Sequence, residues 1–207
     1  MRQPVRVAVL ISGAGSNMAA LIDATRSDVE RGGGASHEVV LVVSNRPDAG
    51  GLAIAQAKGV TALAIDHRPF GKDREAHERA VHDALIQADV QVIALAGYMR
   101  ILTPFLVRSW AGRMLNIHPS LLPLYPGLDT HARAIAAGDA EAGCTVHLVT
   151  DGVDEGPILG QARVPILPGD TAETLSERVR VAEHGLYPAV LAAFCAAFLP
   201  PPRGEGR

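Results

Sequence analysis

VRVAVLISGAGSN, residues 5–17, is the stretch of sequence that decides the fold. Val5 to Ile11 is an apolar run broken only by Arg6, with the length and composition of a buried strand. Ser12 to Asn17 forms a glycine-containing turn, and Met18 to Arg31 continues with a helical pattern. A buried strand that turns directly into a helix is typical of α/β proteins, so we expect this class of fold.

The alternation of strands and helices continues along the chain. Further strands are predicted at Glu38–Val43, Ala62–Ile65, Val90–Ala96, Arg113–Ile117, Cys144–Val149 and Ile158–Val164. Helices are predicted at Gly51–Ala57, Asp73–Ala88, Thr103–Trp110, Thr130–Ala137 and Thr171–Phe198, the last interrupted near Gly185 to Pro188. With no repeat and no linker in residues 1–207, we expect a single domain with a mostly parallel central sheet, helices on both faces and a disordered tail from Pro200 to Arg207.

The composition excludes several classes of function. The 207 residues are 48% hydrophobic and 20% charged, with a formal net charge of −3. This balance argues against a nucleic-acid partner and against disorder. No apolar run reaches the roughly 20 residues that span a bilayer, and no signal-peptide pattern precedes the first strand. Two cysteines, Cys144 and Cys195, form no disulfide framework, so we expect a cytoplasmic protein without membrane contact.

Metal binding finds little support in the sequence. The eight histidines are scattered, and no H-x-x-x-H or H-E-x-x-H spacing occurs. Neither cysteine has a neighbouring ligand. We therefore expect chemistry that needs no metal.

The glycine-rich turn allows more than one interpretation. Free N–H groups at a helix N-terminus favour a bound phosphate, and glycine lets the backbone approach it closely. The same glycines could simply supply a turn with positive φ. A dinucleotide site is a weaker alternative, because Met18 stands where the third glycine belongs and Ser44-Asn45-Arg46 replaces the acidic residue, although Arg46 could meet an NADP phosphate.

Polar side chains end a later predicted strand. Asn116 and His118 are two residues apart and project to the same face at the carboxyl end of that strand. An amide that donates to an oxyanion beside an imidazole that moves a proton suits acyl transfer, although the two could instead satisfy backbone groups at the strand end. The following loop, Pro119 to Pro126, is stiffened by proline, and Leu122–Pro123 is a candidate cis bond.

An acidic loop provides a candidate third group. Thr150 to Gly156 lies between two predicted strands and contains Asp151, Asp154 and Glu155. A carboxylate from this loop within reach of His118 would orient the imidazole ring. A solvated turn of Asp and Gly is the alternative explanation.

Six stretches together carry a resemblance to a known family. They are VAVLISGAGSNMAALI from Val7, SNRPDAGGLAIA from Ser44, LAGYMRILTP from Leu95, LNIHPSLLPLYPGL from Leu115, GCTVHLVTDGVDEGPILGQA from Gly143 and AEHGLYP from Ala182. In this order the chain resembles the folate-dependent formyltransferases, most closely the members that act on glycinamide ribonucleotide in purine biosynthesis. The resemblance implies a single-domain Rossmann-like formyltransferase fold.

The resemblance also implies a reaction and a catalytic trio. A formyl group passes from N10 of 10-formyltetrahydrofolate, the co-substrate, to the amine of glycinamide ribonucleotide, with no metal. Asn116 and a protonated His118 would stabilise the tetrahedral oxyanion, and Asp154 would hold His118 charged and assist proton transfer.

Further residues are matched to the two substrates by the same resemblance. The ribonucleotide site, with its phosphate site in the N-terminal half, comprises Gly15, Ser16, Asn17, Arg180 and Glu183. The folate site, toward the C-terminal half, comprises Arg74, Met99, Arg100, Ile101, Leu102, Val107 and Asn116. Two positions depart from the family pattern, because Asp129 stands where many relatives have histidine and Arg180 where Gln or Lys is expected.

Other functions remain as alternatives. A tRNA-formylating relative would carry a second, basic domain, and a deformylase would carry an extra amino-terminal domain; with 207 residues and Val5 opening the first strand, we expect neither. A non-catalytic nucleotide-binding module or an NADP oxidoreductase would have no use for Asn116, His118 and Asp154. The resemblance leaves the oligomeric state open between monomer and homodimer.

Overall fold

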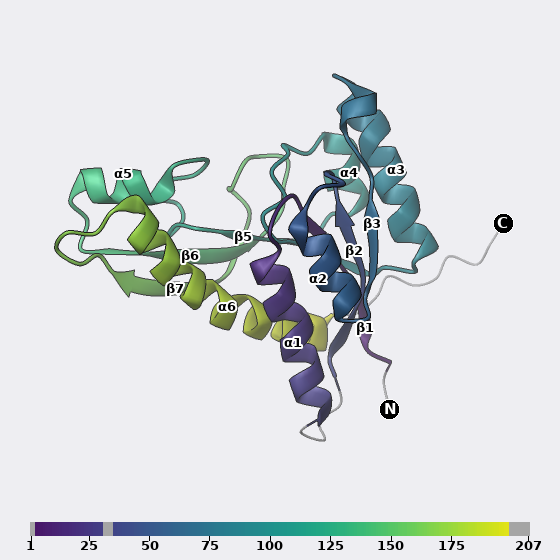
Figure 1. Ribbon diagram of the computed structural model, residues 1–207, viewed down its shortest axis with the longest axis horizontal. Helices are drawn as coiled ribbons and strands as arrows, with labels where there is room; N and C mark the ends of the chain where they lie inside the picture. The colour runs from purple at the N-terminus through teal and green to yellow at the C-terminus, as the bar shows by residue number, and fades with distance from the viewer. Residues whose placement is uncertain (1–2, 31–34, 199–207) are drawn as a thin grey trace.

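The structure is a computed structural model that describes residues 3–30 and 35–198. Within these residues, seven strands form one sheet in the order β3-β2-β1-β4-β5-β6-β7 (Figure 1). The strands are β1 (Val5–Ile11), β2 (His37–Ser44), β3 (Thr61–Ala64), β4 (Val92–Leu95), β5 (Met114–His118), β6 (Glu141–Leu148) and β7 (Ile158–Pro165). All pairs from β3 to β5 are parallel, whereas β6 pairs antiparallel with β5 and β7, so the predicted mostly parallel sheet is confirmed.

Helices cover both faces of the sheet. One face packs against α1 (Ser16–Glu30), α2 (Gly50–Ala57) and α6 (Ala172–Ala197), and the other against α3 (Arg74–Gln87) and α4 (Pro104–Ser109). The short helix α5 (Thr130–Ala137) packs against α6 beside β6 and β7, away from β1 to β3 (Figure 1), and a 3₁₀ turn, η1 (Arg68–Phe70), precedes α3. The predicted disordered tail and the last residue of the first predicted helix lie outside the described residues.

The central strand β1 is almost continuously apolar because it is buried on both of its faces. Val7, Val9 and Ile11 pack in the core on the α1 and α6 side. Ala8 and Leu10 pack in the separate core on the α3 and α4 side. All five side chains are fully buried, as expected for a parallel strand covered on both faces.

The strand order places a crevice at one edge of the sheet. From β1 the chain moves to β2 on one side, and later to β4 on the other, so the order reverses between β1 and β4. Ligands of open α/β sheets bind outside the carboxyl ends of the strands at such a switch point. The glycine-rich turn after β1 and the polar end of β5 both lie at this edge.

Helix α6 corrects one prediction. It runs from Ala172 to Ala197 without the interruption expected near Gly185 to Pro188, and Pro188 lies inside it. The helix persists because a stripe of its side chains, from Val179 through Tyr187 to Leu191, is buried in the core. Packing of that stripe outweighs the backbone hydrogen bond that proline cannot make.

Candidate active site

A cavity of about 720 Å³ opens at the carboxyl ends of β4 and β5. Its wall is assembled from segments far apart in the sequence, together with Asn17 from α1 and Glu183 from α6. The remaining lining residues fall in residues 95–102, 107, 116–119, 127–131 and 147–154. This is the crevice that the strand order predicts, and it contains Asn116, His118 and Asp154.

The His118 imidazole lies between two oxygen acceptors. Nδ1 lies 3.3 Å from Oδ2 of Asp154, and Nε2 lies 2.9 Å from the Tyr125 carbonyl oxygen. A carbonyl only accepts hydrogen bonds, so Nε2 carries hydrogen, and a carboxylate facing Nδ1 favours a second hydrogen there. The surroundings of His118 therefore suit an imidazolium ion, and the predicted carboxylate within reach of the ring is Asp154.

Asp154 is held by groups on both of its oxygens. Oδ2 accepts from the Gly127 backbone N–H at 2.9 Å, and Oδ1 lies 3.6 Å from Nε2 of His147. Burial by itself raises the pKa of Asp154, but contact with His147, the Gly127 hydrogen bond and the charge of His118 together lower the pKa below its ordinary value. Asp154 is therefore an ionised carboxylate at neutral pH.

His147 is a member of this cluster that the sequence analysis missed. Its Nδ1 lies 2.9 Å from the Leu148 carbonyl oxygen, and its Nε2 lies 3.1 Å from Nδ2 of Asn116 and 3.6 Å from Oδ1 of Asp154. The contact fixes the orientation of the Asn116 amide. Asn116 lies opposite His147 because β5 pairs antiparallel with β6. This proximity depends on the register of the two strands, which the sequence alone does not reveal.

Strained backbone marks the same region. Tyr125, Asp129 and Asp154 are non-glycine residues with φ between 53° and 56°. Such left-handed conformations cost free energy and cluster at functional sites. Asp129 is the N-cap residue of α5, but its side chain makes no capping hydrogen bond, and both Asp129 and Asp154 line the cavity.

The glycine-rich turn packs against the start of α2. Gly15 has φ +75°, and a Cβ there would lie 2.8 Å from Cε of Met18 and 2.9 Å from Cα of Gly51. The Gly51 N–H donates to the Gly13 carbonyl at 3.0 Å. The turn therefore needs glycine for both its conformation and its close contact, and it presents the N-terminus of α1, which begins at Ser16.

The predicted ribonucleotide residues are only partly brought together. Asn17 Nδ2 donates to Oε2 of the buried Glu183 at 2.8 Å, and both residues line the cavity. Burial raises the pKa of Glu183, although the Asn17 hydrogen bond and the charge of Arg180 oppose the rise. Arg180 itself is exposed, 3.7 Å from Glu177, and is outside the described lining, as are Gly15 and Ser16.

The predicted folate residues line the cavity, with one exception. Met99, Arg100, Ile101, Leu102 and Val107 all contribute to the wall, and Met99 and Ile101 are 68% and 65% exposed at its mouth. Arg74 is outside the described lining, and its Nη1 donates to the Ile101 carbonyl at 3.3 Å. Its contact is therefore with the backbone of the wall.

The end of β2 is occupied by internal contacts. Ser12 Oγ donates to Oδ1 of Asn45 at 2.6 Å and accepts from the Met99 N–H at 2.8 Å. Arg46, the candidate for an NADP phosphate, is exposed and paired with Asp48 at 2.7 Å. The Ser12 contacts connect the ends of β1 and β2 to Met99 in the wall of the cavity. The Arg46 side chain is paired with Asp48.

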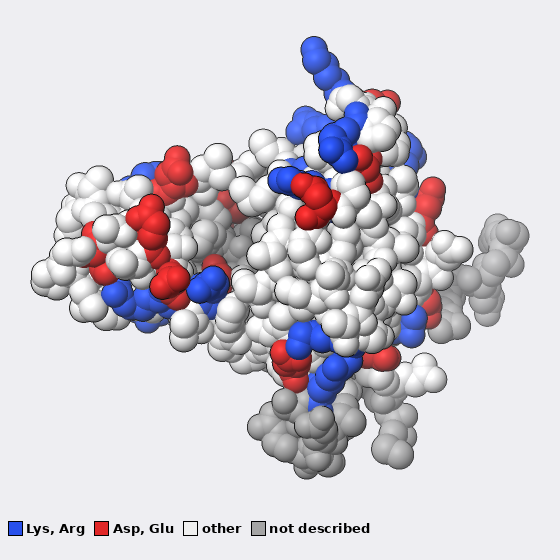
Figure 2. Space-filling model, in the orientation of Figure 1, with Lys and Arg blue, Asp and Glu red and all other residues white. Residues whose placement is uncertain are grey.

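The described residues contain neither a metal-binding cluster nor a membrane-spanning helix. No group of three or more His, Cys, Asp or Glu side chains among them could hold a metal ion. No helix in the described part of the chain is long and apolar enough to cross a membrane. Acidic and basic side chains are interspersed on the face drawn in Figure 2.

Comparison with known proteins adds the decisive observation. Residues 5–191 match the family described as formyl transferase. The chain belongs to the formyl transferase family. This confirms the family predicted from the six sequence stretches, and it removes the dinucleotide-dependent oxidoreductase as an alternative.

Individual members of the formyl transferase family are similar over most of the chain. Phosphoribosylglycinamide formyltransferase from Escherichia coli (strain K12) is 44% identical, over 92% of this chain and 87% of its own length. The crystal structure of phosphoribosylglycinamide formyltransferase from Brucella melitensis has a TM-score of 0.87 and 51% identity, covering 95% of this chain and 98% of that one. The trifunctional purine biosynthetic protein adenosine-3 from Drosophila melanogaster is 50% identical over 90% of this chain, but the match spans only 14% of its length.

Proposed function

We propose that this chain transfers the formyl group of 10-formyltetrahydrofolate to the amine of glycinamide ribonucleotide, a step of de novo purine biosynthesis. The observation that carries the proposal is the meeting of Asn116, His118 and Asp154 in one cavity of a formyl transferase fold. The similarity to phosphoribosylglycinamide formyltransferases supports the choice of acceptor.

The chemistry follows from the partners of the three side chains. The amine nitrogen attacks the formyl carbon, and the carbonyl oxygen becomes an oxyanion. The Asn116 amide, oriented by His147, donates a hydrogen bond to this oxygen, and the positive charge of His118 stabilises it. When the bond between the formyl carbon and N10 breaks, the proton lost by the amine reaches N10, with Asp154 assisting through water.

The ribonucleotide occupies the side of the cavity formed by α1 and α6. Backbone N–H groups of Gly15, Ser16 and Asn17 bind its phosphate at the helix N-terminus. Glu183 accepts hydrogen bonds from ribose hydroxyl groups. Asn17 Oδ1 is buried and has no hydrogen-bond partner among the described residues, so a ribose hydroxyl would satisfy it as well.

The folate occupies the side formed by residues 99–102. Backbone groups of this segment bind the pterin edge, and Val107 provides an apolar contact from the wall of the cavity. Arg74 supports the segment through the Ile101 carbonyl. Arg180 reaches the phosphate of the ribonucleotide by leaving its contact with Glu177.

The wider setting follows from the same proposal. The partners are the two small-molecule substrates, with neither nucleic acid nor membrane, and the reaction uses no metal. The enzyme works in the cytoplasm as a monomer or a homodimer.

The test is a turnover assay with pure protein and three acceptors. With glycinamide ribonucleotide we expect acceptor-dependent loss of 10-formyltetrahydrofolate, followed by the absorbance of the folate product. With water alone, or with initiator methionyl-tRNA, we expect no turnover. Turnover with water alone would identify a deformylase, and turnover with tRNA would identify a tRNA formyltransferase; either result rejects the proposal.

A further inference from the structure

The second partner of His118 is a backbone carbonyl whose direction depends on an unusual conformation. Tyr125 has φ +53°, and its carbonyl oxygen accepts from Nε2 of His118 at 2.9 Å. Oγ of Ser120 donates to the Leu124 carbonyl at 2.6 Å and lies 3.2 Å from the Tyr125 carbonyl oxygen. A left-handed tyrosine is strained, so this geometry persists only where surrounding contacts hold the residue.

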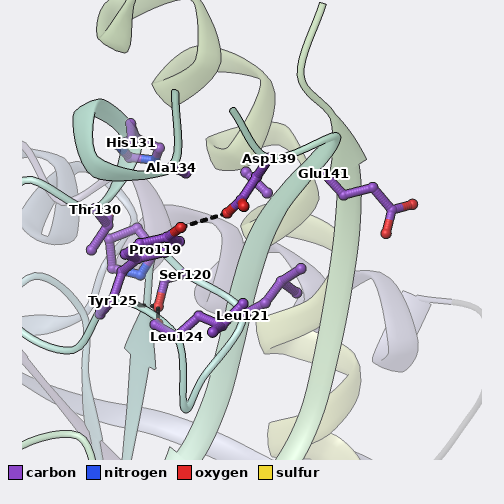
Figure 3. A pocket seen from close by; sticks show the side chains of 11 residues that line it. Pro119, Ser120, Leu121, Leu124, Tyr125, Thr130, His131, Ala134, Asp139 and Glu141 are labelled. Carbon is purple, nitrogen blue, oxygen red and sulfur yellow. Dashed lines mark hydrogen bonds between the residues drawn. The ribbon is translucent and has the colours of Figure 1, made fainter. Parts of the chain in front are cut away.

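The Tyr125 side chain is held outside the active-site cavity. Its hydroxyl donates to Oδ2 of Asp139 at 2.6 Å, in the small space of about 10 Å³ shown in Figure 3. This hydrogen bond raises the pKa of the Tyr125 phenol, so the phenol stays neutral and remains a donor at neutral pH. Asp139 lies between α5 and β6, so the bond joins the loop after β5 to a different part of the fold.

A second contact acts on the same ring. The Arg133 guanidinium lies 5.2 Å from the centre of the Tyr125 ring, and its Nη1 donates to the Pro126 carbonyl at 2.7 Å. Helix α5 therefore covers the ring on one side while Asp139 holds the hydroxyl. No other tyrosine among the described residues combines positive φ with a carboxylate partner.

We propose that Tyr125 is a positioning residue for His118, and that its hydrogen bond to Asp139 sets the carbonyl that fixes the imidazole. The proposal rests on the formyl transfer proposed above, in which the charge of His118 stabilises the oxyanion. With the Tyr125 carbonyl on Nε2 and Asp154 on Nδ1, both ring nitrogens are satisfied only when the ring faces one way. Loss of the phenol contact releases the carbonyl and lets the ring turn.

The kinetic test compares Tyr125→Phe and Asp139→Ala with two matched variants. We expect the first two to lower kcat roughly tenfold, with KM for both substrates within about twofold. Asp139→Asn retains an oxygen acceptor for the phenol and should keep most of kcat. Glu141→Ala removes the neighbouring carboxylate, which points away from Tyr125 in Figure 3 and pairs with Arg163 at 3.0 Å, and should match the wild type.

A second measurement reports on His118 without activity. In ¹⁵N-labelled protein the Nε2–H of His118 should exchange slowly with solvent, because a carbonyl holds it in a buried setting. Its exchange should accelerate in Tyr125→Phe and Asp139→Ala but not in Asp139→Asn or Glu141→Ala. If the wild type transfers no formyl group, the proposed function fails, and this measurement alone still decides the positioning role.

Two results would overturn the inference. One is unchanged kcat and unchanged exchange of the His118 proton in Tyr125→Phe. The other is a loss of kcat accompanied by an equal rise in both KM values and by the same loss in Glu141→Ala, which indicates general loosening of the fold.

Discussion

Asp154 and His118 come from different parts of the sheet, and yet Oδ2 of the aspartate lies 3.3 Å from Nδ1 of the histidine. His118 ends β5, whereas Asp154 lies in the loop between β6 and β7. Both side chains are largely buried, with 7% and 11% of their surfaces exposed, so little solvent separates the two groups. Their contact joins the acidic loop to the strand end that carries Asn116.

Replacing His118 with alanine tests whether its charge acts on the reaction. We expect His118→Ala to lower kcat by about 10²- to 10³-fold, because a preorganised charge near the oxyanion is lost. The dissociation constant for glycinamide ribonucleotide should change by less than about twofold. Steady-state kinetics and calorimetric titration measure the two quantities, and an equal loss of binding would show that His118 holds substrate instead.

Replacing Asp154 with asparagine tests the role of the carboxylate. Because contacts lower the pKa of Asp154, the group is charged throughout the range from about pH 5 upward. Asp154→Asn should therefore lower kcat at every pH in that range. Glu155→Gln, which changes the exposed neighbouring carboxylate, should leave the pH–rate profile unchanged.

The same substitution has a predicted effect on stability. A carboxylate with a lowered pKa in the folded state stabilises the fold above its unfolded pKa of about 4, and this contribution is lost as pH falls through the folded pKa. Denaturant unfolding of Asp154→Asn should give a lower free energy than the wild type at pH 7. A difference that fails to shrink below about pH 4 would mean that packing, and not charge, accounts for the effect.

The raised pKa of Glu183 predicts pH-dependent ribonucleotide binding. As pH falls from 7 toward that pKa, the carboxylate takes up a proton and accepts hydrogen bonds from ribose hydroxyl groups less well. The dissociation constant for glycinamide ribonucleotide should rise accordingly. Glu183→Gln should raise it roughly tenfold at pH 7 and remove the dependence, whereas Glu173→Gln, at an exposed position in the first turn of α6, should retain wild-type behaviour.

The glycine-rich turn offers a matched pair of substitutions. Gly15→Ala places a methyl group 2.9 Å from Cα of Gly51 at a residue with φ +75°, and should lower the free energy of unfolding by about 2 kcal/mol or more. Gly13→Ala meets no atom within 4 Å and should unfold like the wild type. Thermal unfolding of the two variants checks the difference, and equal stability would contradict the packing described for Gly15.

Much of the fold could be predicted because local patterns determine it. The apolar run of β1 and the alternation of strands and helices gave the α/β class and the positions of the seven strands to within a few residues. The continuity of α6 could not be predicted, since Gly185 and Pro188 weaken a helix locally while its burial against the sheet restores it. Helix propensity depends on residues close in the sequence, whereas the burial of α6 depends on the whole sheet against which it packs.

In the candidate site, too, some residues could be predicted from local sequence patterns, and others depend on the three-dimensional structure. Asn116 and His118 were predicted because they share a strand. The acidic loop predicted only a carboxylate, and the resemblance to the formyltransferases singled out Asp154. His147 and Tyr125 were missed, because one depends on the register of β5 with β6 and the other on a positive φ. Arg180 and Arg74 are predicted at the substrates, and in the structure they contact Glu177 and the Ile101 carbonyl, contacts that no spacing in the sequence reveals.

The central claim is tested most directly by following the formyl carbon itself. Pure protein is mixed with 10-formyltetrahydrofolate labelled with ¹³C in the formyl group and with glycinamide ribonucleotide, and the products are identified by mass spectrometry. The account predicts that the label appears on the ribonucleotide amine at a rate that His118→Ala reduces about 10²-fold or more. Label that stays on the folate, or that appears as free formate at the same rate without the ribonucleotide, would contradict the account.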